Sequence, residues 1–127
     1  MNVVDSSGWM EYFADGPNAN FFEPPILNLE NLVVPALSLF EVFKRIIQHK
    51  DEGIALQAIA VMQQGNIINL DTTLAIDAAR LSVALKIPMA DSIMLAISRS
   101  FDAVLWTQDS DFTGIDNVKF CKKKGVY

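Results

Sequence analysis

Acidic side chains that border apolar segments are the residues of this chain most able to do chemistry. They occur in four separate segments, and two of them stand one residue apart in the stretch LWTQDSDF. Acids in apolar surroundings are unfavourable unless a cation or several hydrogen-bond donors stabilise the charge. Carboxylate oxygens favour Mg²⁺ or Mn²⁺, and a single His and a single Cys make zinc a poor fit. The candidate metal ligands are Asp5, Glu41, Asp91, Asp109 and Asp111.

Four of these acids also have an ordinary structural explanation. Asp5 and Asp91 stand at places where the N-cap of a helix is expected, because an apolar helical pattern begins close to each of them. Asp109 and Asp111 follow an apolar run and are typical of a polar turn. For each acid alone the structural explanation is at least as good as the functional one. The functional hypothesis depends on all of them meeting at one place.

Glu41 has two structural alternatives of its own. With Ser38 it matches the pattern S-x-x-E of a capping box, in which the glutamate bonds back to the helix backbone. It also stands three and four residues before Lys44 and Arg45, so an ion pair on one helix face is a second explanation. Only the structure can decide between these alternatives and a role in a metal site.

The pattern along the chain predicts short apolar strands that alternate with helices. The predicted strands are 2–5, 32–34, 66–70, 103–106 and 118–120, and the predicted helices are 6–15, 36–47, 54–64, 72–86 and 90–100. Residues 18–31 show no clear pattern, and Pro24-Pro25 is expected to break any helix there. This alternation predicts one α/β domain over residues 1–127, a three-layer α/β/α sandwich around a parallel sheet of four or five strands. Ligands of such sheets bind beyond the carboxyl ends of the strands.

Composition excludes several functional classes. The net charge is −5, and residues 1–43 contain six acids and no Lys or Arg, so a basic protein that coats DNA is excluded. Nucleic acid remains a candidate ligand if divalent cations bridge the acids to phosphates. No apolar run is long enough to span a membrane, no signal-peptide pattern is present, and the single Cys121 cannot form an internal disulfide. A cytoplasmic location without a membrane partner is therefore expected.

Four pieces of the sequence, in this order, resemble the PIN-domain family, and within it the VapC-type toxins of toxin–antitoxin pairs. The pieces are VVDSSGWMEYF (3–13), VPALSLFEVFKRI (34–46), IPMADSIMLAIS (87–98) and LWTQDSDF (105–112). The resemblance implies that the family's catalytic and metal-binding acids fall on Asp5, Glu41, Asp91 and Asp109. It places Asp111 in the last motif as a further metal ligand, and it gives the hydroxyls of Ser6 and Thr107 a supporting role next to the site.

The resemblance also implies an activity and partners. It implies an endoribonuclease that uses Mg²⁺ or Mn²⁺ to hydrolyse RNA, leaving a 5′-phosphate and a 3′-hydroxyl. It implies that the chain is the toxin of a type II toxin–antitoxin system. The implied partners are the RNA substrate, a small antitoxin protein and a second copy of the chain in a homodimer.

Two other functional classes compete with the nuclease. The first is a binding module that keeps the fold and holds RNA or a protein partner without cleaving; the presence of all four family acids favours the enzyme. The second is a phosphoryl-transfer or receiver-type domain, because Asp5 follows the first strand. A phosphohydrolase of the haloacid dehalogenase type requires a second Asp where this chain has Ser7, and a receiver domain requires a pair of adjacent acids. Asp71 matches the phospho-accepting position of a receiver, but the acid pair is missing.

Overall fold

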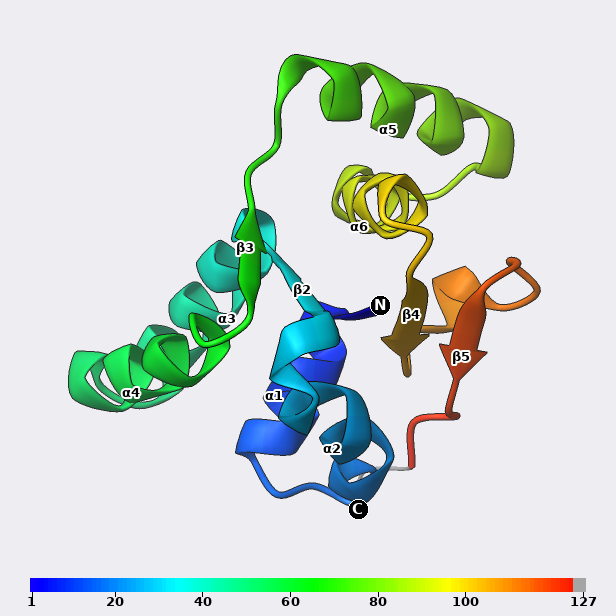
Figure 1. The fold of residues 1–127 in the computed structure, drawn as a ribbon. Coiled ribbons are helices and arrows are strands. Elements are labelled where there is room, and N and C mark those ends of the chain that lie inside the picture. The colour runs from blue at the N-terminus through cyan, green and yellow to red at the C-terminus, as the bar shows by residue number, and fades with distance from the viewer. Residues whose placement is uncertain (125–127) are drawn as a thin grey trace.

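A parallel sheet forms the centre of the molecule. The computed structural model describes residues 1–124 (Figure 1). Five strands lie in the order β3-β2-β1-β4-β5, and every neighbouring pair is parallel. The strands are β1 (Asn2–Val4), β2 (Leu32–Pro35), β3 (Asn66–Ile68), β4 (Val104–Thr107) and β5 (Val118–Phe120). The prediction of a parallel sheet with four or five strands is confirmed.

Helices connect the strands and cover both faces of the sheet. They are α1 (Ser6–Phe13), α2 (Ala19–Leu27), α3 (Ala36–His49), α4 (Glu52–Met62), α5 (Thr72–Leu85) and α6 (Met89–Ser100), with short 3-10 turns η1 (Leu29–Asn31) and η2 (Ser110–Phe112). Apart from α2 and the two turns, each element lies within two residues of its predicted bounds. Among residues 1–124 no single helix is long and apolar enough to cross a membrane, although α5 and α6, bent by 116°, reach that length and composition together.

The alternation of side chains along the strands creates two hydrophobic cores. Val3 and Val4 are both completely buried, yet they belong to different cores because successive side chains of a strand point to opposite faces. The core that contains Val3 is closed by α5 and α6, and the core that contains Val4 is closed by α1, α2, α3 and α4. A sheet covered on both faces has continuous apolar strands, as the sequence shows. The predicted three-layer sandwich is confirmed.

Helix α2 is the element that the sequence did not predict. Pro24 and Pro25 lie inside it, although proline removes a backbone donor and was expected to break any helix in this region. The helix persists because its apolar face is buried. Phe22 and Ile26 belong to the core that contains Val4, and Pro25 is also buried. Tertiary packing therefore outweighs the loss of two hydrogen bonds in a short helix.

The strand order places a topological switch point between β1 and β4. From β1 the chain adds β2 and β3 on one side, and later it adds β4 and β5 on the other. Val4 of β1 is in register with Trp106 of β4, and the backbone N–H of Asp5 donates to the carbonyl of Trp106 at 3.1 Å. The residues after β1 and after β4 therefore meet at the carboxyl edge of the sheet, where α/β proteins bind their ligands.

Candidate metal centre

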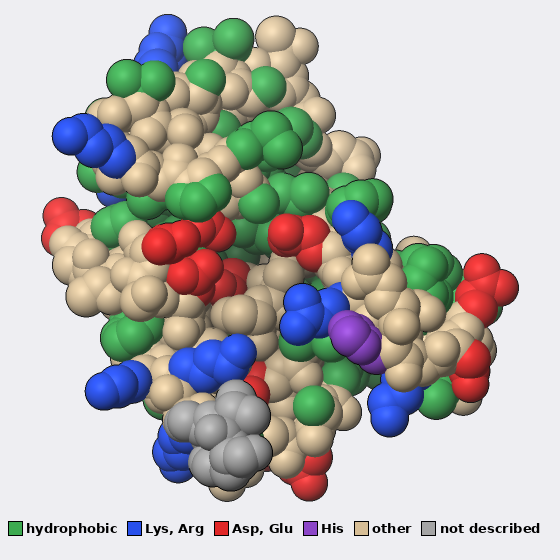
Figure 2. All heavy atoms as spheres, turned by 180° about the vertical axis from the view of Figure 1, so that it is seen from behind, with side chains coloured by type: hydrophobic (Ala, Val, Ile, Leu, Met, Phe, Trp, Pro, Cys, Tyr) green, Lys and Arg blue, Asp and Glu red, His purple; other side chains and the backbone are tan. Residues whose placement is uncertain are grey.

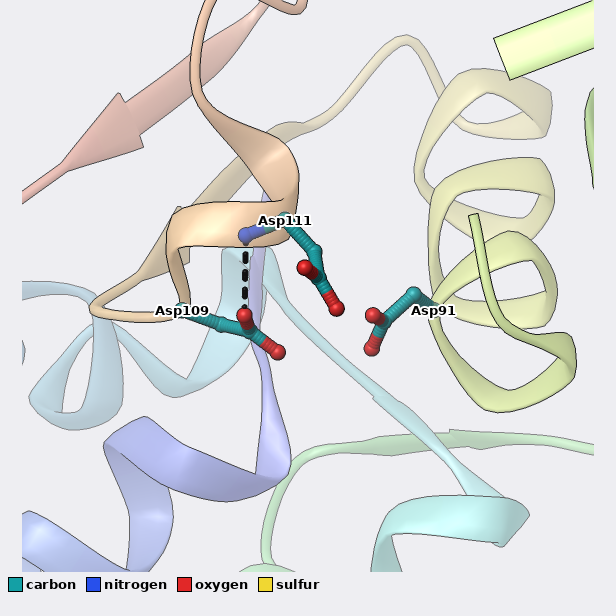
Figure 3. Close-up of side chains that lie close together, drawn as sticks. All are labelled: Asp91, Asp109 and Asp111. Carbon is teal, nitrogen blue, oxygen red and sulfur yellow. Dashed lines mark hydrogen bonds between the residues drawn. The ribbon is translucent and has the colours of Figure 1, made fainter. Parts of the chain in front are cut away.

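Three carboxylates from two separate segments converge at this edge (Figure 3). Asp91 comes from the first turn of α6, and Asp109 and Asp111 come from the turn that follows β4. One oxygen of each side chain lies within 4.8 Å of one oxygen of each of the others. The structure thus brings these three acids together at the switch point. Asp91 is not the N-cap of its helix, since Pro88 occupies that position.

Asp5 lies next to this group, at the end of β1. Its side chain is almost completely buried, with 4% exposure. Oδ1 accepts hydrogen bonds from the Ser7 hydroxyl at 2.8 Å and from the Gly8 backbone N–H at 2.9 Å. Asp5 is thus the N-cap of α1, as its structural explanation predicted, and the cap also fixes one carboxylate oxygen at the site.

Thr107 ties the ends of the two central strands together. Its hydroxyl donates to Oδ2 of Asp5 at 2.5 Å and accepts the backbone N–H of Asp109 at 2.9 Å. Because the Thr107 side chain is fully buried, both hydrogen bonds are shielded from water. One hydroxyl group therefore links Oδ2 of Asp5 to the start of the turn after β4.

The turn after β4 is held by one of its own acids. Oδ1 of Asp109 accepts the backbone N–H of Asp111 at 2.9 Å, the hydrogen bond drawn in Figure 3, and this bond caps the short turn η2. The other oxygen of Asp109 and the carboxylate of Asp111 point toward Asp91. The polar-turn explanation is therefore correct for the backbone of this segment. It does not exclude a metal site, because the same turn presents two carboxylates to Asp91.

Burial and, to a smaller extent, the nearby negative charges raise the pKa values of two of these acids. The pKa of Asp91 rises from 3.8 to about 7, first because burial disfavours the charged form, then because of the negative charge of Asp109, with smaller effects of Asp111 and Asp5. The pKa of Asp5 rises to about 6, because burial outweighs the hydrogen bonds that Thr107, Gly8 and Ser7 donate. Without a cation, the folded chain resists full ionisation of this group.

No basic side chain of the described residues neutralises the group. Within residues 1–124 the only ion pair joins Arg80 to Asp77 on the surface of α5. Figure 2 shows the result: acidic side chains gather in the middle of one face, with hydrophobic side chains on one side and Lys and Arg side chains on the other. An uncompensated set of oxygen ligands fits a divalent cation such as Mg²⁺ or Mn²⁺, and the absence of nearby His and Cys does not fit zinc.

Glu41 lies outside the three-carboxylate group. Its Oε1 accepts the hydroxyl hydrogen of Ser6 at 2.6 Å, so it is linked to the residue after Asp5. Neither structural alternative for Glu41 is correct. The hydroxyl of Ser38 donates to the sulfur of Met94 and forms no capping box, and no ion pair joins Glu41 to Lys44 or Arg45.

The structure adds a buried polar network that the sequence did not indicate. Gln108, between Thr107 and Asp109, is buried, and its side-chain carbonyl accepts the amide of Asn18 at 3.0 Å. Its own amide donates at 3.4 Å to the carboxylate of Glu11, which also accepts the backbone N–H of Asn18 at 2.7 Å. These bonds anchor the turn after β4 to the loop between α1 and α2. The one signal in the sequence was a glutamine at the end of an apolar strand.

A family model gives independent support to the family resemblance of the sequence. The model of the PIN domain matches residues 3–118, which is most of the chain. This chain belongs to the PIN domain family. The match includes all of the acids described above, so the resemblance read from the four sequence pieces is confirmed. No curated protein matches the chain in sequence at a significant level.

Solved structures with the same fold include toxin–antitoxin proteins. A chain of a toxin–antitoxin complex from Klebsiella pneumoniae has 21% identity and a TM-score of 0.79, covering 94% of this chain and 96% of that one. The sarcin–ricin loop cleaving toxin VapC20 from Mycobacterium tuberculosis has 14% identity and a TM-score of 0.76, with coverages of 91% and 95%. A chain of VapBC2 from Rickettsia felis, bound to a promoter DNA fragment, has 15% identity and a TM-score of 0.73, with coverages of 94% and 96%. At these identities the likeness concerns the fold.

Proposed function

We propose that this PIN-domain chain is a metal-dependent endoribonuclease and the VapC-type toxin of a type II toxin–antitoxin system. The observation that carries the proposal is the convergence of Asp91, Asp109 and Asp111 beside buried Asp5 at the switch point of the sheet. Uncompensated carboxylates at this place need a cation, and a divalent cation beside a phosphodiester is the arrangement of metal-assisted hydrolysis. The sarcin–ricin loop cleaving toxin supports RNA as the substrate class.

The acids of the site have different proposed roles. The proposed ligands of Mg²⁺ or Mn²⁺ are Asp91, Asp109 and Asp111, with Asp5 beside them. Glu41, whose carboxylate accepts the Ser6 hydroxyl, is proposed as a further acidic residue of the site. When bound, the metal screens the phosphodiester, lowers the pKa of water and stabilises charge on the leaving oxygen.

The rest of the site holds these acids in position. Thr107 fixes Asp5 relative to the turn that carries Asp109, so that the acids of two strands keep their relative positions. Hydrolysis would break the bond from phosphorus to the 3′-oxygen and leave a 5′-phosphate and a 3′-hydroxyl. These are the products that the resemblance to the family implies.

The proposal is tested by incubating the purified chain with total cellular RNA in Mg²⁺, in Mn²⁺ and in EDTA, together with Asp5→Asn and Asp91→Asn. We expect discrete cleavage that requires metal and is lost in both variants. Asp102→Asn is the matched control, because Asp102 is an exposed acid at the opposite end of β4 and has φ 50°, a conformation that Asn tolerates. Cleavage that survives both site substitutions would contradict the proposal.

The second candidate function is a binding module that holds RNA or a protein without cleavage. It is favoured by the position of Glu41, which is not among the three carboxylates that converge and accepts the hydroxyl of Ser6 instead. Metal binding without cleavage of any RNA pool would support the module over the enzyme. The two candidates share the same metal centre and differ only in the chemical step.

The proposed partners are an antitoxin protein and a second copy of the chain. One structure with this fold is described as a toxin–antitoxin complex and another as VapBC2 bound to promoter DNA, which supports an antitoxin partner. An apolar groove of about 400 Å³ between α3 and α4, lined by Leu39, Phe43 and Ile59, offers a place for a segment of such a partner. Light scattering of the isolated chain tests the dimer, for which twice the mass of 14.1 kDa is expected.

A further inference from the structure

A cleft of about 630 Å³ opens next to the carboxylates, between α1 and α3. Ser6, Ser7 and Gln108 form part of its lining, and they are the immediate or second neighbours in sequence of Asp5 and Asp109. The cleft therefore adjoins the candidate metal centre. Its volume lies in the range of pockets that enclose a ligand of about the size of a nucleotide.

Three basic side chains line this cleft, and none of them has an acidic partner. Lys44 and Arg45 project from α3, three and four residues after Glu41, and Lys123 comes from the C-terminal segment. In the described part of the chain no carboxylate lies within ion-pair distance of these cations. Cations that form no ion pair, next to a site that collects carboxylates, fit an anionic ligand that bridges the two regions.

The two acids of the cleft are directed to partners inside the protein. Glu41 accepts the hydroxyl of Ser6 at 2.6 Å. Glu11 accepts the backbone N–H of Asn18 at 2.7 Å and the amide of Gln108 at 3.4 Å. These hydrogen bonds hold both carboxylates against the wall of the cleft. The basic side chains are therefore the charged groups that are free to meet a ligand.

An exposed aromatic ring stands beside the cations. Phe40 lies between this cleft and the apolar groove of α3 and α4, lines both, and is 61% exposed. The ammonium group of Lys44 lies 5.7 Å from the centre of its ring. An exposed ring next to cations is the arrangement with which proteins stack an unpaired base while they hold the adjacent phosphates.

We infer that this cleft binds the single-stranded RNA segment next to the phosphodiester that is cleaved. Lys44, Arg45 and Lys123 contact its phosphates, and Phe40 stacks against one of its bases. The strand must be unpaired, since a base inside a duplex has no free face for Phe40. The inference rests on the proposed ribonuclease function and adds the side chains that hold the substrate beside the cleavage site.

The test measures binding separately from cleavage. The affinity of a short, labelled, unstructured RNA is measured by fluorescence anisotropy over a series of KCl concentrations with Mg²⁺ present, in an Asp91→Asn background that is expected not to cleave. Three variants are added to this background: Lys44→Gln/Arg45→Gln, Phe40→Ala, and the control Arg80→Gln/Lys86→Gln. The control removes one Arg and one Lys from exposed positions at α5, away from the cleft.

Charge and stacking have different signatures in this experiment. Three phosphate contacts predict that log Kd rises with log salt concentration with a slope of about 2.1, and loss of two of them reduces the slope to about 0.7. The control double variant keeps the original slope. Phe40→Ala is expected to weaken binding about tenfold with an unchanged slope, because stacking is not an ionic contact. A duplex of the same sequence is expected to bind without any dependence on Phe40.

Two outcomes would overturn the inference. In one, the cleft double variant shows the same slope as the control double variant, so RNA does not contact Lys44 and Arg45. In the other, an acidic peptide displaces RNA but Phe40→Ala leaves the RNA affinity unchanged, which makes the cleft a protein-binding site. Failure of the ribonuclease proposal is visible separately: the Asp91-containing chain would then cleave no RNA whether or not the slopes agree with the inference.

Discussion

Two neighbouring regions of the molecule carry unpaired charges of opposite sign. One is the acid group, which consists of Asp91, Asp109 and Asp111 with Asp5 beside them, and the other is the cleft between α1 and α3. In the first, carboxylate oxygens of Asp91, Asp109 and Asp111 lie within 4.8 Å of one another, and no basic side chain of the described residues forms an ion pair with them. In the second, Lys44 and Arg45 face the cleft with no carboxylate in ion-pair distance. Charges of opposite sign stand on one face and do not pair. Stability alone does not explain why these charges are kept apart. The separation is explained if the acids bind a cation and the basic side chains bind an anionic ligand.

The comparison also shows where stability and function diverge. Burial, with a further contribution from the neighbouring carboxylates, raises the pKa of Asp91 to about 7 and that of Asp5 to about 6, which means that their ionised forms destabilise the metal-free fold. The cleft carries no such penalty, because exposed cations remain hydrated. The acid group should therefore respond strongly to metal and to pH, while the cleft should respond to salt.

The largest effect expected on stability is that of metal on the acid group. A divalent ion present at a hundred times its dissociation constant stabilises the folded state by about 2.7 kcal/mol. For a chain of this size that corresponds to a rise in Tm on the order of 10 °C. We expect this rise with Mn²⁺ in differential scanning fluorimetry. It should be lost in Asp91→Asn and kept in Asp102→Asn and in Lys44→Gln/Arg45→Gln; an equal rise in all variants would place the metal elsewhere.

The next effect concerns the hydroxyl that joins the two central strands. Thr107→Val keeps the shape of the side chain but leaves an oxygen of Asp5 and the N–H of Asp109 without their partner. We expect a loss of about 1 to 3 kcal/mol in the free energy of unfolding. Affinity for Mn²⁺ should fall roughly 10- to 100-fold, as measured by calorimetry. Thr107→Ser, which keeps the hydroxyl, should restore most of both, and a Val variant with unchanged metal affinity would contradict the role given to Thr107.

A smaller effect is expected from pH in the absence of metal. Asp5 and Asp91 have pKa values above their ordinary value of 3.8, so the folded state binds more protons than the unfolded state between about pH 4 and pH 7. The stability that they contribute is therefore lost as pH rises through this window. In EDTA the chain should melt several degrees higher at about pH 5 than at about pH 8.

The Asp5→Asn/Asp91→Asn double variant isolates this contribution from that of all other groups. Its Tm should depend less on pH than that of the unmodified chain in the same buffers, since neither amide titrates. An identical pH dependence of the two proteins would show that other groups control acid stability. It would also remove the electrostatic contrast between the acid group and the cleft.

The smallest change in metal affinity is expected at Glu41, which borders both regions. Glu41→Gln keeps an acceptor for the Ser6 hydroxyl but removes the charge. Because Glu41 lies outside the three-carboxylate group, the Mn²⁺ dissociation constant should change by less than the roughly 10- to 100-fold expected for Thr107→Val, although RNA cleavage should fall. A loss of Mn²⁺ affinity as large as that of Asp91→Asn would instead show that Glu41 is a direct metal ligand and belongs to the acid group.

Much of the acid group could be predicted from the sequence because strand ends are easy to recognise. Val3-Val4 before Asp5, and the apolar run before Thr107, identify the two strands whose carboxyl ends meet. Helix α2 could not be predicted, since its survival through Pro24 and Pro25 depends on the burial of one face in the core.

The cleft could not be predicted from the sequence either. The spacing of Lys44 and Arg45 suggests ion pairs with Glu41 on one helix face, and only the packing of α3 against α1 shows that they line a common cleft. The network of Gln108 needs the loop between α1 and α2, which no local pattern positions. The sequence therefore indicates local chemistry at strand ends more readily than surfaces that two distant helices build together.

Binding of a divalent metal by the acid group can be seen by anomalous diffraction from crystals soaked in Mn²⁺. We expect an anomalous peak in direct contact with carboxylate oxygens of Asp91 and Asp109, with Asp5 or Asp111 completing the ligands, and no such peak in Asp91→Asn crystals. A fully soaked crystal without a peak at the switch point, or with its peak at other residues, would show that the acids do not form a metal site.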